Sequence, residues 1–275
     1  MRVIVVSNPW DIVILGCGQL GGNLKTALEA EKIHVLGVRR TPIPDDSTFI
    51  SLDLDAADDW EQLAQLKLAA NAVIVAIVTP DARTEDAYRQ RYVGISERLR
   101  QFVSVPNREH PVIWVSSTAV FGQYQFGVLD ELVQADPDHW RGHCLREAEQ
   151  NIERIQAATV IRFTGLYNAQ SLIRLQDQGF RAQLNSKAVS NRIHREDAVS
   201  WLKALTCDYL QKTPVPSLIH GVDMGSASYQ QIYDFLDGVS SAIQPATAGR
   251  IVNSRYRDRM PALQYPTCEA IVNSP

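Results

Sequence analysis

The feature that most constrains this chain is a glycine-rich turn near its start. The turn, Gly16-Cys17-Gly18-Gln19-Leu20-Gly21, follows the apolar run Ile12–Leu15 and leads into a helical pattern. With this spacing, the first glycine permits a tight turn, the second lets another group approach the backbone, and the third lets helix and strand pack closely. A strand, this turn and a helix together predict the opening unit of a doubly wound α/β sheet.

Short apolar runs alternate with helical patterns along most of the chain. This alternation is typical of a parallel sheet whose strands are joined by crossover helices, and the β-branched residues in the runs suit strands buried on both faces. The expected strands are Ile12–Leu15, His34–Val38, Val73–Val78, Pro111–Val115, Thr159–Arg162 and Ser217–Gly221. The expected helices lie near 19–30, 57–66, 84–102, 138–156, 195–210 and 227–238.

Two stretches break the alternation and predict a second, smaller lobe. We interpret residues 1–165 as a Rossmann domain to which 191–221 returns, and residues 166–190 and 222–275 as a small substrate lobe. The last forty residues or so contain several prolines and are expected to be irregular. The predicted fold class is therefore α/β, a Rossmann-type doubly wound parallel sheet with a small C-terminal substrate lobe.

Composition and charge exclude several classes of function. The 275 residues carry a formal net charge of −4 and a pI near 5.9. These values argue against a nucleic-acid-binding protein, because such proteins present a basic face. No apolar run approaches the roughly 20 residues needed to span a bilayer. Met1–Trp10 is interrupted by Asn8-Pro9 and is not expected to be a signal peptide.

The cysteines are scattered and form no C-x-x-C pair, which fits reduced thiols better than disulfides or a zinc site. They are Cys17, Cys144, Cys207 and Cys268. His139 and His143 are four residues apart, but no third ligand is evident, so no metal site is expected. We therefore expect a cytoplasmic protein with no nucleic-acid or membrane partner, and a homodimer stays open as an alternative to a monomer.

The glycine turn also predicts a site for a nicotinamide dinucleotide. Gly16, Gly18 and Gly21 have the spacing of the dinucleotide-binding fingerprint. The start of the following helix, with Gln19 and Leu20, supplies N–H groups that can bind the pyrophosphate. The alternative is a tight strand–helix turn that binds no ligand. On the first interpretation, residues 1–165 form an NAD(P)-binding domain.

Two arginines at the end of the second strand bear on which cofactor is bound. An NAD site normally has Asp or Glu here to hold the ribose 2′-hydroxyl, whereas Arg39 and Arg40 offer planar cations suited to a 2′-phosphate. We therefore predict NADP, with NAD as the alternative; in the plainer interpretation, the arginines simply end an exposed strand. Asp53 stands where a third strand would end beside the adenine, although a loop aspartate would look the same.

Four segments resemble motifs of one family, in order and spacing. Val115–Gly122 resembles a strand motif S-S-x-x-V-Y-G, Arg162–Asn168 resembles R-x-x-x-I-Y-G, and Arg192–Asp197 resembles R-I-H-x-x-D. Tyr265–Glu269 is similar to a closing Y-P-x-x-x-E-G pattern, with the glutamate one residue early and no glycine after it. The chain thus resembles the extended short-chain dehydrogenase/reductase family, specifically its atypical NAD(P)-dependent epimerase/dehydratase-like members.

The resemblance implies a catalytic Ser or Thr with a Tyr and a Lys four residues apart on a helix. Ser117 matches the serine. With Glu149 aligned to the family's helix glutamate, Arg141 stands at the tyrosine position and Leu145 at the lysine position. An arginine cannot act as a base near neutral pH, and a leucine cannot hydrogen-bond a ribose. The usual catalytic pair is therefore absent.

Other side chains are candidates for the missing proton donor or acceptor. Tyr124 and Tyr167 could reach the nicotinamide side of a cleft, and His143 is a titratable group on the helix, although we favour the plainer interpretation of a partly exposed helix histidine. The predicted function is an NAD(P)-binding, epimerase/dehydratase-like oxidoreductase acting on a small carbonyl or sugar-like substrate. The chain leaves little room for a nucleoside-diphosphate pocket. The alternative is a catalytically inactive NAD(P)(H)-binding sensor or scaffold.

Overall fold

The computed structural model describes residues 9–106 and 108–272, without the side chains of 271 and 272. Most of the segment Met1–Trp10, which is not expected to be a signal peptide, lies outside the described residues, as does Pro275. In the part of the chain that the structure covers, no helix combines the length and apolar character needed to cross a membrane.

Seven strands form the central sheet, in the order β11-β7-β5-β4-β1-β2-β3. The pairs β1/β2, β1/β4, β2/β3 and β4/β5 run parallel. The strands are β1 (Trp10–Leu15), β2 (Val35–Arg39), β3 (Phe49–Ser51), β4 (Leu68–Ala76), β5 (Val112–Ser117), β7 (Ala158–Phe163) and β11 (Leu218–Gly221). The order reverses direction between β1 and β4, which is the topological switch point of a doubly wound sheet. The predicted α/β class with a doubly wound parallel sheet is confirmed.

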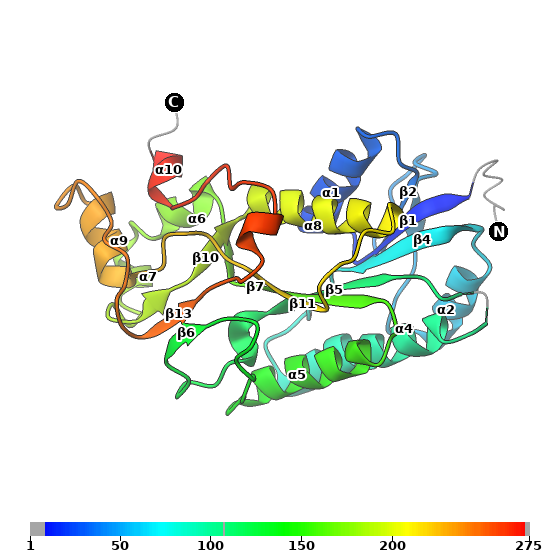
Figure 1. Cartoon of the computed structure of the whole chain (residues 1–275), viewed down its shortest axis with the longest axis horizontal. Helices are drawn as coiled ribbons and strands as arrows, with labels where there is room; N and C mark the ends of the chain where they lie inside the picture. Colours follow the sequence, from blue (N-terminus) through cyan, green and yellow to red (C-terminus); the bar gives the residue numbers. More distant parts are fainter. Residues whose placement is uncertain (1–8, 107, 273–275) are drawn as a thin grey trace. The chain divides into compact units, whose positions relative to one another are not determined.

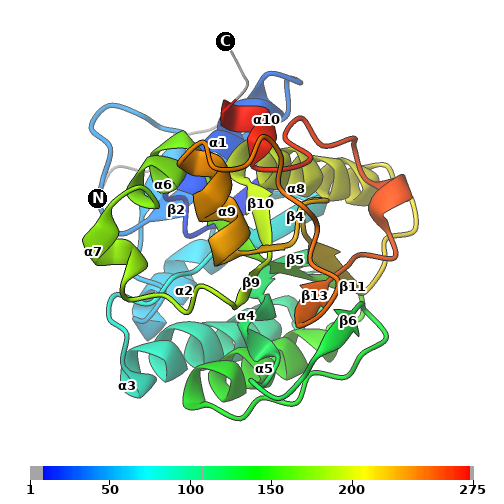
Figure 2. The ribbon, with the colours of Figure 1, turned by 90° about the vertical axis from the view of Figure 1, so that its left-hand side faces the viewer.

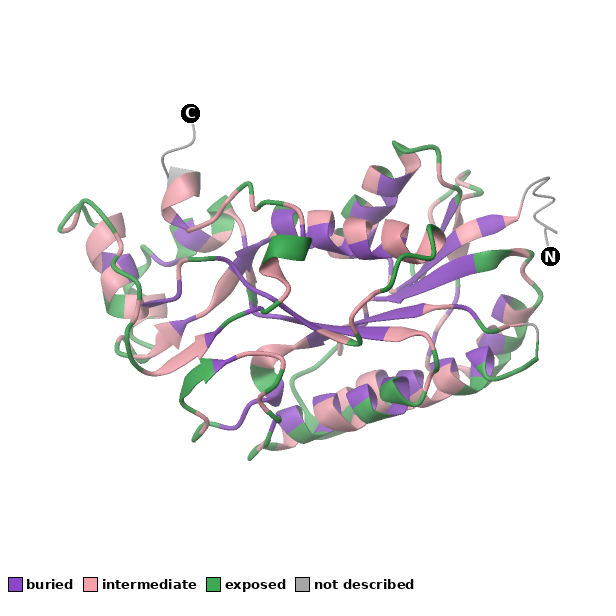
Figure 3. Ribbon diagram, viewed as in Figure 1, coloured by how far each residue is buried: buried purple, intermediate pink, exposed green. Residues whose placement is uncertain are grey.

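Six of the seven strands overlap the apolar runs expected from the sequence, and most of their residues are buried; the short edge strand β3 was not among the expected strands and none of its residues is fully buried. Val13 and Ile14 alternate to opposite faces of β1, yet both are buried, and Figure 3 shows the same burial along most of the central strands. In the register of the sheet, Val13 lies between Leu36 of β2 and Ile74 of β4. The central strands therefore cannot shift without exposing apolar surface.

Helices cover both faces of this sheet, with α1 on one face and α4 and α5 on the other (Figure 1). Figures 1 and 2 show α4 and α5 side by side. The helix expected near 84–102 is instead divided by a π-helical segment, η1. The helices of this part are α1 (Gln19–Glu29), α2 (Ala57–Ala64), α3 (Glu85–Tyr88), η1 (Arg89–Gly94), α4 (Ile95–Val103), α5 (Trp140–Glu153) and α8 (Arg195–Leu210).

The remaining elements are short and form three two-stranded sheets, β10/β8, β12/β9 and β13/β6. A small apolar core that includes Tyr167, Leu172 and Ile232 holds several of them together. The strands are β6 (Gly127–Leu129), β8 (Gly165–Tyr167), β9 (Val189–Ser190), β10 (Arg192–His194), β12 (Ala227–Ser228) and β13 (Arg250–Val252). The helices are η2 (Thr118–Val120), α6 (Ala169–Arg174), α7 (Gln178–Arg181), α9 (Tyr229–Leu236), η3 (Arg257–Arg259) and α10 (Glu269–Val272).

The chain divides into two compact units. The first contains the described residues up to Ser116, with His139–Ile161 and Leu202–Leu218. The second contains Ser117–Asp138, Arg162–Trp201 and the described residues from Ile219 onward. The predicted division into a cofactor domain and a substrate lobe has other boundaries. Because that division is defined by function rather than by compactness, it stays a prediction.

Candidate functional site

The glycine turn has the geometry that each of its glycines was expected to provide. Gly16 has a φ of +83°, and a Cβ atom there would lie 2.2 Å from the carbonyl oxygen of Ile77. A Cβ on Gly21 would lie 3.1 Å from Cγ2 of Ile14, so this glycine lets α1 pack against β1. A Cβ on Gly18 would have nothing within 4 Å. Gly16 is therefore required by the backbone and Gly21 is closely packed, whereas Gly18 faces open space.

A cavity of about 240 Å³ opens beside this turn, entirely within the first unit. We call it the glycine-turn cavity; its lining includes Gly16–Gly18 after β1, Val38–Thr41 at the end of β2, and Ile77–Thr79 after β4. It lies at the carboxyl ends of strands at the switch point, where doubly wound sheets bind ligands. No side chain caps the start of α1 and no acidic residue occupies its first turn. The cavity thus suits an anionic group.

The two predicted cofactor arginines have different surroundings. Arg40 forms a bidentate ion pair with Asp81, with distances of 2.6 and 2.5 Å from its two nitrogens to the carboxylate oxygens. Arg39, which is half-buried, has no carboxylate partner among the described residues, and it lines the glycine-turn cavity beside Arg40. The charge of Arg40 is therefore largely neutralised, while that of Arg39 is available to a ligand.

Arg91 is a third arginine of the glycine-turn cavity, and sequence reasoning missed it. It is 7% exposed, and one of its nitrogens lies 2.9 Å from Asp55 and 3.0 Å from Asp81. Asp53, predicted to lie beside the adenine, does not line the cavity; its carboxylate is 4.0 Å from Arg91. Arg91 lies in what reads as an ordinary helical stretch, and its acidic partners are distant in sequence, so no local signal marked it.

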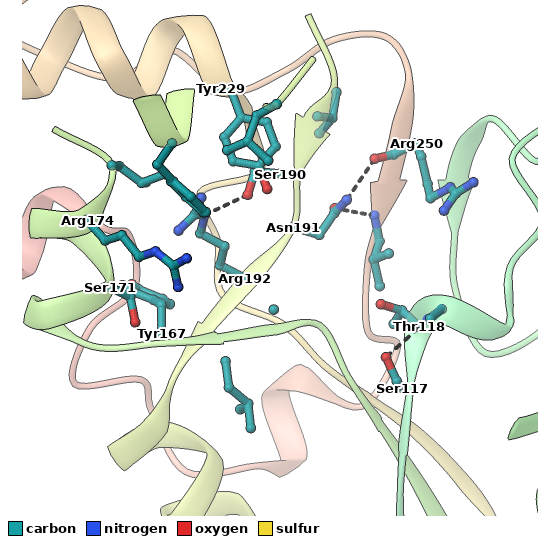
Figure 4. A pocket seen from close by; sticks show the side chains of 18 residues that line it. Ser117, Thr118, Tyr167, Ser171, Arg174, Ser190, Asn191, Arg192, Tyr229 and Arg250 are labelled. Atoms are coloured by element: carbon teal, nitrogen blue, oxygen red, sulfur yellow. Dashed lines mark hydrogen bonds between the residues drawn. The ribbon is translucent and has the colours of Figure 1, made fainter. Parts of the chain in front are cut away.

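A second cavity, of about 470 Å³, lies entirely within the second unit (Figure 4). We call it the arginine cavity, because Arg174, Arg192 and Arg250 are among its lining residues. Two predicted catalytic residues, Ser117 and Tyr167, line it as well. The structure therefore brings these two side chains to one cavity from segments fifty residues apart in the sequence.

Ser117 ends β5 and caps the short helix η2. Its Oγ accepts a hydrogen bond of 3.2 Å from the backbone N–H of Ala119, and the residue is half-buried. A hydroxyl that accepts this bond still has its own proton to donate. Ser117 is therefore held in place by the backbone and can donate a hydrogen bond to a carbonyl or hydroxyl oxygen in the arginine cavity.

The other three predicted catalytic residues lie in unlike surroundings. Tyr167 is 1% exposed, its hydroxyl makes no hydrogen bond of normal geometry within the described residues, and burial raises its pKa well above the ordinary value. Tyr124 is 77% exposed and does not line the arginine cavity. His143 is exposed on α5, in the first unit. Of the three, Tyr167 alone shares a cavity with Ser117.

Helix α5 carries Arg141 and Leu145, the two residues that the resemblance aligns with a catalytic tyrosine and lysine. Arg141 is exposed, with its guanidinium over the ring of Trp140, and Leu145 is buried in the core. One turn later, the buried carboxylate of Glu149 accepts a hydrogen bond of 2.6 Å from Ser116 Oγ and lies 3.2 Å from Arg146. The polar contacts therefore join α5 to β5 and hold the helix in place. Across the described residues, no cluster of three or more His, Cys, Asp or Glu is placed to hold a metal ion.

Asp223 is a buried carboxyl close to Tyr167 that sequence reasoning did not single out. It is 3% exposed, and its Oδ1 accepts a hydrogen bond of 3.0 Å from the backbone N–H of Gly225. Burial raises its pKa to about 7, against the opposing effects of that N–H, the charge of Arg192 and the nearby hydroxyl of Tyr167. At low pH the folded protein therefore holds a proton that the unfolded chain releases more readily.

We expect this carboxyl to make the free energy of unfolding fall as the pH rises from about 4 to 7. The unfolded chain, with a pKa near 3.8, loses the proton first, so the stabilisation is complete below pH 3.8 and is lost as the pH approaches about 7. The slope from one such group is at most about 1.4 kcal/mol per pH unit. In Asp223→Asn, urea unfolding between pH 4 and 7.5 should show a flatter profile; identical profiles would contradict the assignment.

The lining of the arginine cavity includes polar residues that were not predicted as site residues. Arg192 stands in the segment Arg192–Asp197, whose resemblance to a family motif was a usable signal. Arg174 lies on α6, in a stretch with no recognisable pattern. Asn191 donates a hydrogen bond of 2.9 Å to the carbonyl of Arg250, so it connects two walls of the cavity. That contact spans 59 residues and leaves no local signal.

Solved structures with the same fold cover nearly all of this chain. One is a protein of Methylobacillus flagellatus to which NAD-dependent epimerase/dehydratase activity has been ascribed, with 24% identity, a TM-score of 0.75, and coverage of 94% of this chain and 95% of that one. Another is the UDP-Glc/GlcNAc 4-epimerase of Campylobacter jejuni, with 12% identity, a TM-score of 0.73 and 96% coverage of both chains. A third is MoeE5 in complex with UDP-glucuronic acid and NAD, with 17% identity, a TM-score of 0.69, and coverage of 94% and 95%.

These likenesses show that the chain has the fold shared by NAD-dependent epimerase/dehydratase structures, which confirms, at the level of fold, the resemblance read from the motifs. No protein-family model matches the chain, and no curated protein matches it in sequence. At these identities the comparisons establish the fold, and the chemistry has to be argued from the residues of this chain.

Proposed function

We propose that this protein is an NAD(P)-dependent oxidoreductase of the epimerase/dehydratase type, acting on a small carbonyl or sugar-like substrate. The observation that carries the proposal is the glycine turn at the switch point, where Gly16 and Gly21 are packed against backbone and side chain while Gly18 leaves open space. A small residue there lets the pyrophosphate reach the backbone.

The residues of the glycine-turn cavity fit a nicotinamide dinucleotide. Gly16–Gly18, which line the cavity, and the N–H groups at the start of α1 would hold the pyrophosphate, although Gln19, Leu20 and Gly21 are not part of the lining. Arg39 would hold a 2′-phosphate on the adenosine ribose. When bound, the nicotinamide supplies a hydride acceptor or donor. MoeE5 binds NAD, but the uncompensated charge of Arg39 favours NADP for this chain.

The arginine cavity is the proposed substrate site. Ser117 would orient a carbonyl or hydroxyl oxygen by donating a hydrogen bond, without itself acting as the base. The neighbours bind or act on UDP-sugars, whereas we propose a smaller substrate for this chain. Tyr167, in the same lining, stays a candidate for the proton donor, together with Tyr124 and His143.

A second function, an NAD(P)(H)-binding sensor or scaffold without catalysis, is favoured by two residues of α5. Leu145 is buried and Arg141 is exposed where the family has its lysine and tyrosine. The two functions separate in one experiment: NADPH binding measured by fluorescence, followed by a screen of small carbonyl compounds and sugars for NADPH oxidation. Tight binding with turnover supports the enzyme, tight binding without turnover supports the sensor, and no binding rejects both.

The choice of cofactor can be tested at Arg39. We expect the protein to bind NADPH more tightly than NADH, and Arg39→Asp to lose about 1.5–3 kcal/mol of NADPH binding, because a charge-assisted contact with the phosphate is removed. Arg40→Gln should have a smaller effect, since Arg40 is already paired with Asp81. Fluorescence titrations with both cofactors measure these effects.

The matched control is Arg83→Asp, which makes the same charge change at an exposed arginine outside the glycine-turn cavity. It should leave the ratio of the two affinities as in the parent protein. Equal affinities of the parent for NADPH and NADH would overturn the NADP assignment.

A further inference from the structure

The charges that line the arginine cavity all have one sign. Three arginines line it and none of the other lining residues is acidic. One of the three, Arg250, is committed to the fold: it donates hydrogen bonds to the carbonyl oxygens of Gly122 and Gln125. In Figure 4 its guanidinium points away from Arg174 and Arg192. The charge available to a ligand is therefore that of the other two arginines.

Arg174 and Arg192 are held by aromatic rings and a hydroxyl rather than by carboxylates. The guanidinium of Arg174 lies over the ring of Phe180, 4.2 Å from its centroid. Arg192 lies 5.4 Å from the centroid of Tyr229, and its Nε donates a hydrogen bond of 2.6 Å to Ser190 Oγ. Such contacts orient a guanidinium while leaving its charge uncompensated. Within the described residues, neither arginine forms an ion pair.

Asp223 is a buried carboxyl whose charge interacts with that of Arg192. It is buried outside the lining of the arginine cavity, and its pKa of about 7 keeps it largely protonated below neutral pH. It therefore compensates the charge of Arg192 only in part. Arg174 is exposed on α6, and within the described residues no carboxylate forms an ion pair with it.

Figure 4 separates this charge from the predicted catalytic serine. Arg174 lies with Ser171 on one side of the cavity, with Arg192 close by. Ser117 and Thr118 lie on the opposite side. The two available guanidinium groups thus lie at one end of the cavity, together with Ser171 and Tyr167. A molecule that spans the cavity meets these guanidinium groups at one end and the hydroxyls of Ser117 and Thr118 at the other.

We propose that Arg174 and Arg192 bind an anionic group of the substrate, a phosphate monoester or a carboxylate, and so restrict the substrate to small acids. The inference rests on the proposed function, because it names the substrate class of the same cavity. Two guanidinium groups without acidic partners match the geometry of phosphate and carboxylate oxygens. The carbonyl or hydroxyl to be oxidised or reduced would then lie toward Ser117.

Isothermal titration calorimetry with inorganic phosphate and with succinate tests the proposal without requiring turnover. We expect saturable binding of at least one of the two anions to the parent protein, weakened about 10-fold or more in Arg174→Gln and in Arg192→Gln, because each variant removes a charged hydrogen-bond donor. Arg83→Gln, an exposed arginine of the first unit, is the control with the same change of charge and should bind like the parent.

The outcomes separate this inference from the proposed function. Preferential binding of phosphate identifies a phosphate ester as the anion, and preferential binding of succinate identifies a carboxylate; either result supports the site. Unchanged affinity in Arg174→Gln, whose exposed side chain is not needed for folding, overturns the inference, as does the absence of binding to the parent. If the parent protein binds the anion but does not bind NADPH, the proposed function is rejected, whereas the anion site is supported.

Discussion

Replacing Gly16 by alanine is expected to lower the free energy of unfolding by about 2–5 kcal/mol, whereas the same replacement at Gly18 should cost less than about 1 kcal/mol. Gly16 has a φ of +83°, and the new Cβ atom would lie 2.2 Å from a backbone oxygen of Ile77. Backbone cannot rotate away as a flexible side chain can. At Gly18 the new methyl group would enter open space. Urea unfolding of the two variants measures the difference.

A second replacement at Gly18 tests cofactor binding separately from folding. A bulkier change at the open position, Gly18→Val, should leave the fold intact but fill the space proposed for the pyrophosphate, and NADPH affinity should fall at least about 100-fold, or about 2.7 kcal/mol. Fluorescence titration measures the affinity, and urea unfolding of the same sample serves as the control for folding. Parental NADPH affinity in a folded Gly18→Val variant would show that the turn does not bind the pyrophosphate.

The second large effect concerns chemistry in the arginine cavity. With a substrate found by the carbonyl and sugar screen, Ser117→Ala should lower kcat by about 10²–10³-fold, because a positioned hydrogen-bond donor to the reacting oxygen is lost. NADPH affinity should stay near that of the parent, since Ser117 does not line the glycine-turn cavity. Ser104→Ala removes an exposed hydroxyl that bonds to its own helix, and it is the matched control. Parental turnover in Ser117→Ala would remove the serine from the mechanism.

The proton donor is tested by replacing the two phenols. If Tyr167 or Tyr124 is the general acid, its change to phenylalanine should slow turnover by about 10²–10⁴-fold while leaving cofactor binding unchanged. Burial raises the pKa of Tyr167, which makes it a weaker acid in the folded protein, and Tyr124 is exposed. Measuring kcat for both single variants and the double variant shows which phenol, if either, is the general acid. Parental rates in all three would eliminate both phenols.

The sequence by itself determined most of the central sheet and the glycine turn. The apolar runs predicted the strands, because strands buried on both faces must be apolar along their whole length. The glycine spacing predicted the turn, since the positive φ of Gly16 and the close packing of Gly21 depend on backbone sterics within a short segment. The sequence also shows directly that no tyrosine is followed by a lysine four residues later, because that spacing is a local pattern.

Local patterns were less informative where the elements are short. Helices α6 and α7, in the stretch that broke the alternation, have six and four residues. They are stabilised by packing into a small core around Leu172 and Tyr167 rather than by a repeating apolar face. The π-helical segment η1 interrupted a pattern that predicted one continuous helix. In both places tertiary contacts outweighed local propensity.

Only the tertiary structure decided which charges are available to a ligand. Arg39 and Arg40 are equivalent in the sequence, but Asp81, 41 residues from Arg40, neutralises that arginine and leaves Arg39 with its charge. The arginine cavity likewise combines α6, β10 and the end of β5 into one lining without acidic groups. Ion pairing and burial depend on distances between atoms, and residues far apart in the chain set those distances. A sequence pattern therefore predicts which groups are present, and the fold determines which of them are free to bind.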